Sequence, residues 1–228
     1  MSIQSALVIG ARSGVGRATT EALAAAGARV LAVGRERDAT DPAQVAALLA
    51  EAEPDLVVVA AGARPLMAPI DEQSWESFSA PWNVDVRIAF EVGRAALARP
   101  LRPGSTVVIV SSGAGLEGSP LSGGYAGAKR TQMFLARYLQ GAADARELGL
   151  RFVALAPRQL LAGTRIGEAA AAAYGAQLGE SVETYMSRRF PVALDADGVA
   201  RAVLAIASGE QHGDATLLTV TATALEPI

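Results

Sequence analysis

The sequence predicts a single α/β domain in which parallel strands alternate with helices. Short apolar runs recur along the chain, helical patterns separate most of them, and no repeat or low-complexity linker interrupts the 228 residues. Strands of a parallel sheet are buried on both faces, so they read as continuous apolar runs joined by helical crossovers. Hydrophobic residues make up 51% of the chain, enough for a large core. We therefore expect one domain over residues 1–228.

The expected elements follow in order along the chain. The apolar runs that predict strands are 5–10, 29–34, 55–62, 105–113, 151–157 and 216–221. A small-residue helical pattern follows the first run, and further helical patterns cover 42–52, 85–98, 123–147 and 195–208. Only about one helix fits between the second and third runs. We therefore expect the sheet to be trimmed at that point.

Charge and composition exclude several classes of function. The net charge of −3 argues against a general nucleic-acid binder. The absence of cysteine excludes disulfides and thiol catalysis, and a single histidine, His212, argues against a catalytic triad or a multi-histidine metal site. The N-terminus lacks the features of a signal peptide, and no apolar run is long enough for a membrane span. The expectation is a soluble, cytoplasmic protein without a metal, acting on a small molecule.

The segment GARSGVG follows the first predicted strand and opens a helix. Glycine lets the backbone turn tightly and approach a ligand, and a helix N-terminus offers N–H groups to a phosphate. An ordinary strand-to-helix turn is the alternative, but the position favours a dinucleotide site. The expected contacts of this loop are Gly10, Arg12, Ser13, Gly14, Val15 and Gly16.

The end of the second strand is where a dinucleotide site reads the adenosine ribose. Arg35 lies 19 residues after Gly16 in this position. Its planar guanidinium suits a 2′-phosphate, whereas an acid would suit a free 2′-hydroxyl. Arg35, assisted by Arg12, therefore favours NADP(H) over NAD(H), although the nearby acids Glu36 and Asp38 could reverse the preference. Both arginines could also be ordinary surface residues.

Tyr125 and Lys129 form an i,i+4 pair on one predicted helix face. A fixed ammonium near a phenol favours the phenolate, which suits the tyrosine to proton exchange with a carbonyl oxygen. An exposed lysine beside a half-buried tyrosine is the ordinary alternative. However, Lys129 is the only lysine among 20 basic residues, which favours a need for a compact ammonium at this position.

Ser112 ends the strand that precedes Tyr125 by 13 residues. Ligands of open α/β sheets bind beyond the carboxyl ends of strands, so Ser112 is placed to hydrogen-bond a substrate oxygen. Its neighbour Ser111 is expected to point the other way. Either serine could instead be a simple turn residue.

The glycine loop, the VAAG at 59–62, Ser112 and the Tyr125-x-x-x-Lys129 pair together resemble the short-chain dehydrogenase/reductase family, over roughly residues 5–221. The resemblance implies a Rossmann-type doubly wound sheet and a nicotinamide cofactor. It implies that Tyr125 is the general acid/base, that Lys129 binds the nicotinamide ribose and assists the tyrosine, and that Ser112 orients the substrate carbonyl. It also implies a homodimer or homotetramer formed through helices 85–98 and 123–147.

The chain departs from the family pattern at several points. Ile9 replaces the usual threonine, and Ala60-Ala61-Gly62 replaces Asn-Ala-Gly. Pro157 is followed by Arg158 instead of glycine, and the next threonine, Thr164, comes later than usual. By the resemblance, Ala61, Gly62 and Pro157 are still expected to contact the cofactor.

The fourth catalytic position of the family is usually an asparagine, and PWNVDVRIAF offers both Asn83 and Asp85. Counting back from Phe90 in the family pattern selects Asp85. Helical spacing agrees, because Asp85 shares a stripe of small apolar residues whereas Asn83 lies on a mostly polar face. Asp85 is therefore expected to lie near Lys129. The equally weighted alternative makes Asp85 a helix N-cap.

The segment 158–194 is expected to cover the substrate, with 63–75 as another wall. Tyr174, Tyr185, Met186 and Phe190 suggest an apolar or aromatic substrate, although ordinary core or an oligomer contact would need the same residues. The leading interpretation is an NADPH-dependent carbonyl reductase. A non-redox dehydratase or cyclase on the same scaffold and a non-catalytic NADP-binding regulator remain alternatives, because fold alone does not separate them.

Overall fold

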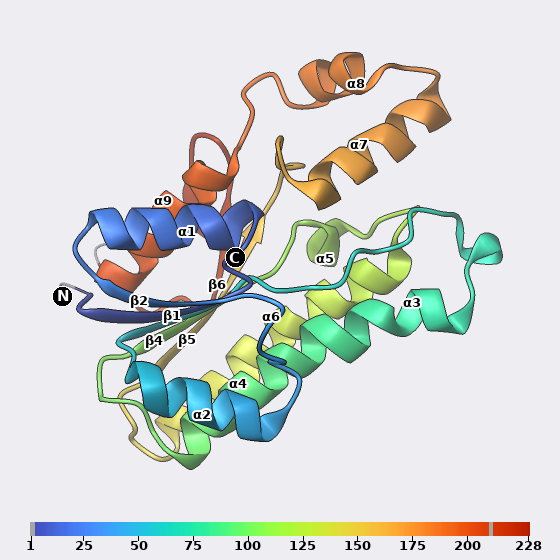
Figure 1. Ribbon diagram of the computed structural model, residues 1–228. Coiled ribbons are helices and arrows are strands. Elements are labelled where there is room, and N and C mark those ends of the chain that lie inside the picture. The colour runs from blue at the N-terminus through green and yellow to red at the C-terminus, as the bar shows by residue number, and fades with distance from the viewer. Residues whose placement is uncertain (1–2, 210–211) are drawn as a thin grey trace.

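The computed structural model of the chain is built on a seven-stranded sheet with helices on both faces (Figure 1). The structure describes residues 3–209 and 212–228, so the remaining positions of the expected 1–228 domain lie outside it. The strand order is β2-β1-β3-β4-β5-β6-β7, parallel except for β7. The strands are β1 (Ser5–Ile9), β2 (Arg29–Val33), β3 (Leu56–Val59), β4 (Thr106–Val110), β5 (Arg151–Pro157), β6 (Leu217–Val220) and β7 (Leu225–Pro227). This arrangement confirms the expected doubly wound α/β class.

Two helical layers sandwich the sheet. Helices α1 (Gly14–Ala25) and α9 (Ala196–Ser208) cover one face, and α2 (Pro42–Ala52), α4 (Arg87–Ala98) and α6 (Gly123–Asp144) cover the other (Figure 1). Alternate residues of a strand face opposite sides. In β1, Leu7 and Ile9 therefore join the core under the second layer, while Ala6 and Val8 join the core under the first.

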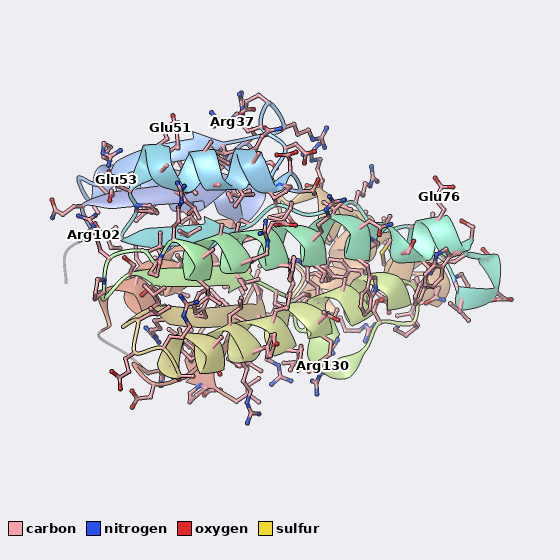
Figure 2. All side chains as sticks on the ribbon, turned by 90° about the horizontal axis from the view of Figure 1, so that it is seen from below. Arg37, Glu51, Glu53, Glu76, Arg102 and Arg130 are labelled. Atoms are coloured by element: carbon pink, nitrogen blue, oxygen red, sulfur yellow. The ribbon has the colours of Figure 1, made fainter. Side chains whose placement is uncertain are left out.

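Figure 2 shows the second layer from below, with α2, α4 and α6 side by side. Charged side chains lie on its outside, for example Arg37 and Glu51, whose Nη1 and Oε2 are 3.3 Å apart. In the described ranges, 3–209 and 212–228, no helix combines the length and the apolar character needed to cross a membrane.

The trimmed edge predicted from the short connection is present. Only α2 lies between β2 and β3, and β2 pairs with β1 alone, so β2 is the edge strand of the sheet. As expected for an edge, β2 is only partly buried, whereas β1 and β3 are buried throughout. The opposite edge carries β7, which the sequence did not predict because its three residues are too short for a recognisable pattern.

The helix expected at 85–98 begins earlier and changes its winding. Helix α3 (Trp75–Pro81) runs into a π-helical turn, η2 (Trp82–Val86), and then into α4. Pro81 has no N–H for the helical ladder, and a one-turn π-bulge is a known way of accommodating such a break. Asp85 lies inside this turn with helical residues on both sides. The alternative that made Asp85 a helix N-cap was therefore wrong.

The segment expected to cover the substrate contains two helices, α7 (Arg165–Leu178) and α8 (Val182–Arg189). In Figure 1 they stand apart from the sandwich, above the end of the sheet where α5 (Ala114–Glu117) and α3 lie. The 63–75 segment contains only a short 3₁₀ turn, η1 (Ile70–Glu72).

Candidate active site

The glycine loop lies at the carboxyl ends of β1 and β3, where open α/β sheets bind ligands. Gly10 has φ +92°, and a Cβ atom there would lie 2.5 Å from the main-chain nitrogen of Ala61. Only glycine fits such a conformation and such a close approach. The turn from β1 to α1 therefore packs directly on the Ala61-Gly62 segment, which brings two of the predicted cofactor contacts together.

The start of α1 offers uncapped N–H groups. Its N-cap residue is Ser13, whose hydroxyl does not cap the helix and instead accepts a hydrogen bond of 3.3 Å from Arg165 Nη2. The Thr164 methyl group would contact a Cβ at Gly14 at 3.4 Å, so the start of α7 crosses the glycine loop. Free N–H groups, the helix dipole and the nearby Arg165 suit a phosphate group at this point.

Arg12 and Glu36 meet at the end of β2. Arg12 Nη2 and Glu36 Oε2 are 3.1 Å apart, and Glu36 Oε1 accepts a 2.7 Å hydrogen bond from the main-chain N–H of Gly34. The hydrogen bond from Gly34 is the main cause that lowers the pKa of Glu36, with Arg12 adding to it. Arg35 is exposed beside this pair. The predicted ribose-reading position therefore carries two exposed guanidinium groups and one ionised acid.

Tyr125 and Lys129 occupy the first turns of α6, as the spacing predicts. Lys129 is only 6% exposed, and its Nζ lies 5.4 Å from the centre of the Tyr125 ring. Nζ donates hydrogen bonds to the main-chain oxygen of Val110 at 3.2 Å and to Gln132 Oε1 at 3.0 Å. The lone lysine is thus a buried cation held directly behind the tyrosine.

Asp85 is the counter-ion of Lys129. Its Oδ2 lies 3.1 Å from Lys129 Nζ, although the direction is not that of a good hydrogen bond, and Oδ1 accepts a 2.7 Å bond from the main-chain N–H of Ala63. Asp85 is fully buried, whereas Asn83 is exposed, as the helical spacing predicted. A Cβ at Gly62 would lie 2.7 Å from Oδ2, so glycine at this position makes room for the carboxylate.

Burial and charge act on Lys129 in opposite directions. Burial alone would lower the pKa of Lys129, because it penalises the ammonium. The negative charge of Asp85, with smaller contributions from Tyr125 and the direct contact with Asp85, outweighs burial and raises the pKa. Lys129 therefore stays protonated at neutral pH.

The two serines at the end of β4 point in different directions, as expected for neighbours on a strand. Ser111 is buried and its hydroxyl donates a 2.8 Å bond to the main-chain oxygen of Lys129, which ties β4 to α6. Ser112 is half-buried, and its Oγ accepts a 3.3 Å bond from the N–H of Ala114. A hydroxyl that accepts one bond retains its proton, so Ser112 can still donate to a ligand.

A series of hydrogen-bonded hydroxyl groups joins helix α7 to the start of α6. Helices α7 and α8, which lie in the segment expected to cover the substrate, are called the covering helices below. Tyr174 Oη of α7 lies 2.5 Å from Ser119 Oγ, which lies 2.6 Å from Ser122 Oγ. Tyr174 also stacks on Tyr185 of α8, with ring centres 6.1 Å apart. The segment 158–194 therefore contacts the loop that leads into Tyr125. Nearby, Arg158 Nη2 is paired with Glu117 Oε1 at the carboxyl end of β5, beside the buried Pro157.

Sequence reasoning missed Gln132, which no pattern marked although it lies one helical turn beyond Lys129. It also missed Tyr174 as a link to the serine loop, because that contact joins positions 55 residues apart.

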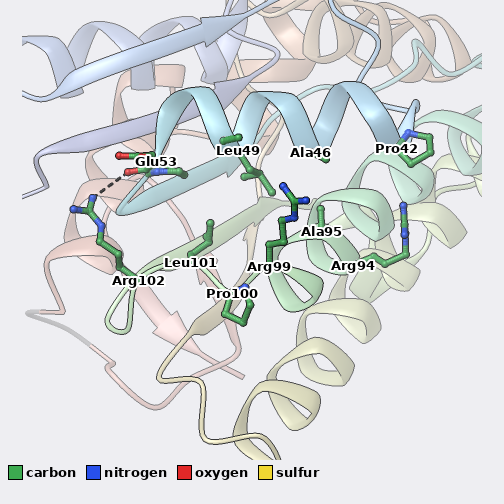
Figure 3. Close-up of a pocket in the computed structure, with 12 residues that line it drawn as sticks. Pro42, Ala46, Leu49, Glu53, Arg94, Ala95, Arg99, Pro100, Leu101 and Arg102 are labelled. Carbon is green, nitrogen blue, oxygen red and sulfur yellow. Dashed lines mark hydrogen bonds between the residues drawn. The ribbon is translucent and has the colours of Figure 1, made fainter.

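Two pockets of about 420 and about 480 Å³ lie at the end of the sheet opposite the glycine loop. The first opens between α2 and the end of α4, with Leu49, Arg99 and Leu101 around it (Figure 3). Both are lined by residues that precede strands, such as Pro54 before β3 and Leu150 before β5. They therefore lie at the amino ends of the strands, away from Tyr125.

Comparison with known proteins supports the family indicated by these residues. A family model described as enoyl-(acyl carrier protein) reductase matches residues 32–214. An uncharacterized short-chain type dehydrogenase/reductase of Sinorhizobium fredii is 30% identical over 142 residues, which are 54% of this chain and 57% of that protein. The chain thus matches little more than half the length of this relative.

Solved structures share the fold over nearly the whole chain. The crystal structure of sorbitol-6-phosphate 2-dehydrogenase from Erwinia amylovora has a TM-score of 0.79 and 24% identity, covering 96% of this chain and 98% of that one. A short chain dehydrogenase from Burkholderia cenocepacia, in complex with NADP, has a TM-score of 0.75 and 23% identity, with 97% and 98% covered.

Proposed function

Since the chain belongs to the short-chain dehydrogenase/reductase family, we propose that it is an NADP(H)-dependent oxidoreductase that interconverts a carbonyl and an alcohol on a small, apolar or aromatic molecule. The observation that carries this proposal is the buried Asp85–Lys129 pair next to Tyr125, at the same end of the sheet as the glycine loop. A tyrosine with a fixed cation behind it is suited to proton exchange with a carbonyl oxygen.

The residues of this edge fit a nicotinamide dinucleotide. The uncapped start of α1, with Gly14, Val15 and Gly16, would receive the pyrophosphate, as helix N-termini receive anions. Ala61, Gly62 and Pro157 lie where strands β3 and β5 end, so their backbones would border the ring end of the ligand. When bound, the nicotinamide supplies or accepts the hydride.

The chain's own groups handle orientation and the proton. Ser112 donates a hydrogen bond to the substrate oxygen and aligns the carbonyl. Tyr125 gives its proton to that oxygen during reduction and takes it back during oxidation. Lys129, kept charged by Asp85, places a fixed positive charge 5.4 Å from the centre of the Tyr125 ring. Tyr174 and Tyr185, on the covering helices, support a preference for an apolar or aromatic substrate.

The exposed guanidinium groups of Arg12 and Arg35 support NADP(H) as the cofactor, since they can pair with a 2′-phosphate. Glu36 is the competing feature, because an ionised acid at this position accepts a bond from a free 2′-hydroxyl. Arg12 is already paired with Glu36. A bound 2′-phosphate would replace the Glu36 carboxylate as the partner of Arg12, so Arg12 would remain paired.

Fluorescence titration with NADPH and NADH, followed by a ketone screen for NADPH oxidation, tests the proposal. We expect tighter binding of NADPH, turnover of apolar ketones, and a loss of at least about a hundredfold in Tyr125→Phe with NADPH binding retained. Tighter binding of NADH would overturn the cofactor preference. Conversion of a substrate without NADPH oxidation would indicate a non-redox enzyme, and binding without any turnover would indicate a regulator.

The exposed aromatic face of α4 and α6 supports assembly into a homodimer or homotetramer. Trp82, Phe90, Phe134 and Tyr138 are between 40% and 66% exposed. Trp82 packs against Gly127, and Gly127, Phe134 and Tyr138 have the spacing of one face of α6. Large aromatic groups gathered on one face are typical of protein interfaces.

A further inference from the structure

The pocket between helix α2 and the end of α4 lies outside the candidate active site (Figure 3). Its volume is about 420 Å³, and pockets that bind small organic molecules usually measure about 300–1,000 Å³. The residues that line it come from α2 and the two residues after it, from the end of α4, and from the loop before β4. None of the described residues proposed to hold the cofactor or the substrate is among them. The pocket is therefore a second place at which a small molecule can bind.

The walls of this pocket are largely apolar. Ala46 and Leu49 border it on α2, and Ala95, Pro100 and Leu101 border it on the opposite side (Figure 3). Alanine side chains are short, so the two helices leave space between them at Ala46 and Ala95. Moving apolar surface out of water is favourable. A ligand that fills this space therefore gains most if its body is apolar.

Three arginines, Arg94, Arg99 and Arg102, also border the pocket, and two of them are neutralised by acids. Arg94 Nη2 lies 2.7 Å from Glu91 Oε2, and Arg102 Nη2 lies 2.7 Å from Asp55 Oδ1. A ligand anion at either arginine would have to displace a carboxylate that is already in place. Neither arginine therefore offers an uncompensated charge.

Arg99 is the cation that remains. Among residues 3–209 and 212–228, which the structure describes, no hydrogen bond, ion pair or ring contact involves its guanidinium. Figure 3 shows this guanidinium reaching from the end of α4 towards Leu49 of α2. Glu53, the acid among the lining residues, lies at the other end, where its main-chain oxygen accepts a 3.0 Å bond from Arg102. An unpaired positive charge thus borders the apolar walls.

We propose that this pocket is a binding site for a small aliphatic carboxylate, with the apolar body between α2 and α4 and the carboxylate on Arg99. A guanidinium matches the two oxygens of a carboxylate with two parallel hydrogen bonds. One unpaired guanidinium balances the single charge of a carboxylate, whereas a phosphate monoester carries a charge of about −1.5 to −2 at neutral pH. The pocket lies at the amino ends of the strands, so the site is distinct from the substrate site proposed at Tyr125.

Calorimetric titration of the full chain with octanoate, 1-octanol and inorganic phosphate tests the ligand class. Octanol has the same apolar chain without the charge, and phosphate has charge without the chain. We expect saturable octanoate binding, at least about fivefold tighter than that of octanol, because a bond to a charged group contributes more than a neutral one. Octanol binding as tight as octanoate would show that the guanidinium is not used, and phosphate binding as tight as octanoate would show a plain anion site. Either result would overturn the proposal.

Arg99→Gln tests the charge directly. We expect this substitution to weaken octanoate binding about fivefold or more and to leave octanol binding unchanged, because only octanoate pairs with the guanidinium. Arg146→Gln is the matched control, since Arg146 is also exposed and is not among the lining residues. Octanoate binding that is unchanged in Arg99→Gln, or weakened equally in both variants, would contradict a role for Arg99.

Ala46→Trp tests the location by filling the pocket. Ala46 and its neighbour Ala47 are both exposed, but only Ala46 lines the pocket, so Ala47→Trp is the matched control. We expect octanoate binding to be lost in Ala46→Trp and kept in Ala47→Trp, with thermal unfolding showing that both variants fold. Octanoate that still binds Ala46→Trp occupies another site, such as the one at Tyr125, and overturns the proposal.

Protein concentration separates a small ligand from a second copy of the chain as the occupant. An octanoate Kd that rises with protein concentration would show that another copy fills the pocket, which would also overturn the proposal. Octanoate binding does not require ketone turnover. A chain that binds octanoate but neither binds NADPH nor reduces a ketone would therefore refute the proposed function and leave this site standing.

Discussion

Lys129 is the residue on which the candidate site depends, because it is a buried cation balanced by one buried anion. Removing one partner of such a pair leaves an uncompensated charge and costs about 3–5 kcal/mol, whereas replacing both partners costs much less. The pair is therefore weak evidence for stability as such. Its position behind Tyr125 indicates that its value lies in the field it creates at the phenol.

The raised pKa of Lys129 predicts a specific loss of stability at high pH. A group whose pKa is higher in the folded than in the unfolded protein stabilises the fold fully below the unfolded value, about 10.4 for lysine. This contribution is lost as the pH rises through the folded value. We expect the free energy of unfolding of the wild type to fall more between about pH 8 and about pH 11 than that of an Asp85→Asn/Lys129→Met variant.

Urea denaturation of both proteins at each pH measures this difference. The other titrating groups are common to the two proteins, so their contributions cancel in the comparison. Parallel curves for the wild type and the double variant would show that Lys129 does not gain its charge stabilisation from Asp85.

At the scale of elements, hydrogen bonds from Tyr174 to Ser119 and from Arg165 to Ser13 join the α7–α8 segment to the rest of the fold. Tyr174 is the clearest of them, since its hydroxyl reaches Ser119 at the loop before α6 while its ring stacks on Tyr185. Few polar links between a segment and the rest of a fold allow local opening without global unfolding. We therefore propose that helices α7 and α8, in the segment expected to cover the substrate, open for substrate entry.

Tyr174→Phe should loosen these helices selectively. The substitution removes the hydroxyl bond to Ser119 and keeps the aromatic stacking, and a typical hydrogen bond contributes about 1 kcal/mol. We expect hydrogen exchange in residues 165–189 to quicken about fivefold, with the sheet unchanged. Tyr138→Phe, at an exposed position on α6, is the matched control and should change nothing in this segment. Exchange measured by mass spectrometry that is equal in both variants would contradict a link through Tyr174.

The sequence predicted the elements that carry strong patterns and missed those fixed by distant contacts. The apolar strands and the Tyr125–Lys129 spacing were readable because burial and the helical period leave regular signals. The placement of Asp85 followed from the same period. The π-helical turn was not predictable, since Pro81 signals a break but not the form it takes. Gln132 was not predictable either, because its partner Asp85 lies 47 residues away and no local pattern records the bond.

At the scale of the whole molecule, the two ends of the strands carry different features. The glycine loop, the Lys129 pair and helices α7 and α8 lie at the carboxyl ends, whereas ion pairs such as Arg102 with Asp55 lie at the amino ends. The outer face of α4 and α6 lies at neither end. Among its exposed aromatic side chains, Phe134 and Tyr138 stack on each other with ring centres 5.8 Å apart.

Assembly through this face predicts a clear response to substitution. Phe134→Glu/Tyr138→Glu places two carboxylates on the shared surface, and a symmetric interface brings each substitution near its own copy, so like charges repel across it. We expect the wild type to sediment as a dimer or tetramer and this variant to dissociate at least about tenfold more readily. Leu178→Glu, on α7 away from this face, is the matched control and should leave assembly unchanged (Figure 1). A wild type that sediments as a monomer at all accessible concentrations, or a variant that assembles like the wild type, would rule out this face as the interface.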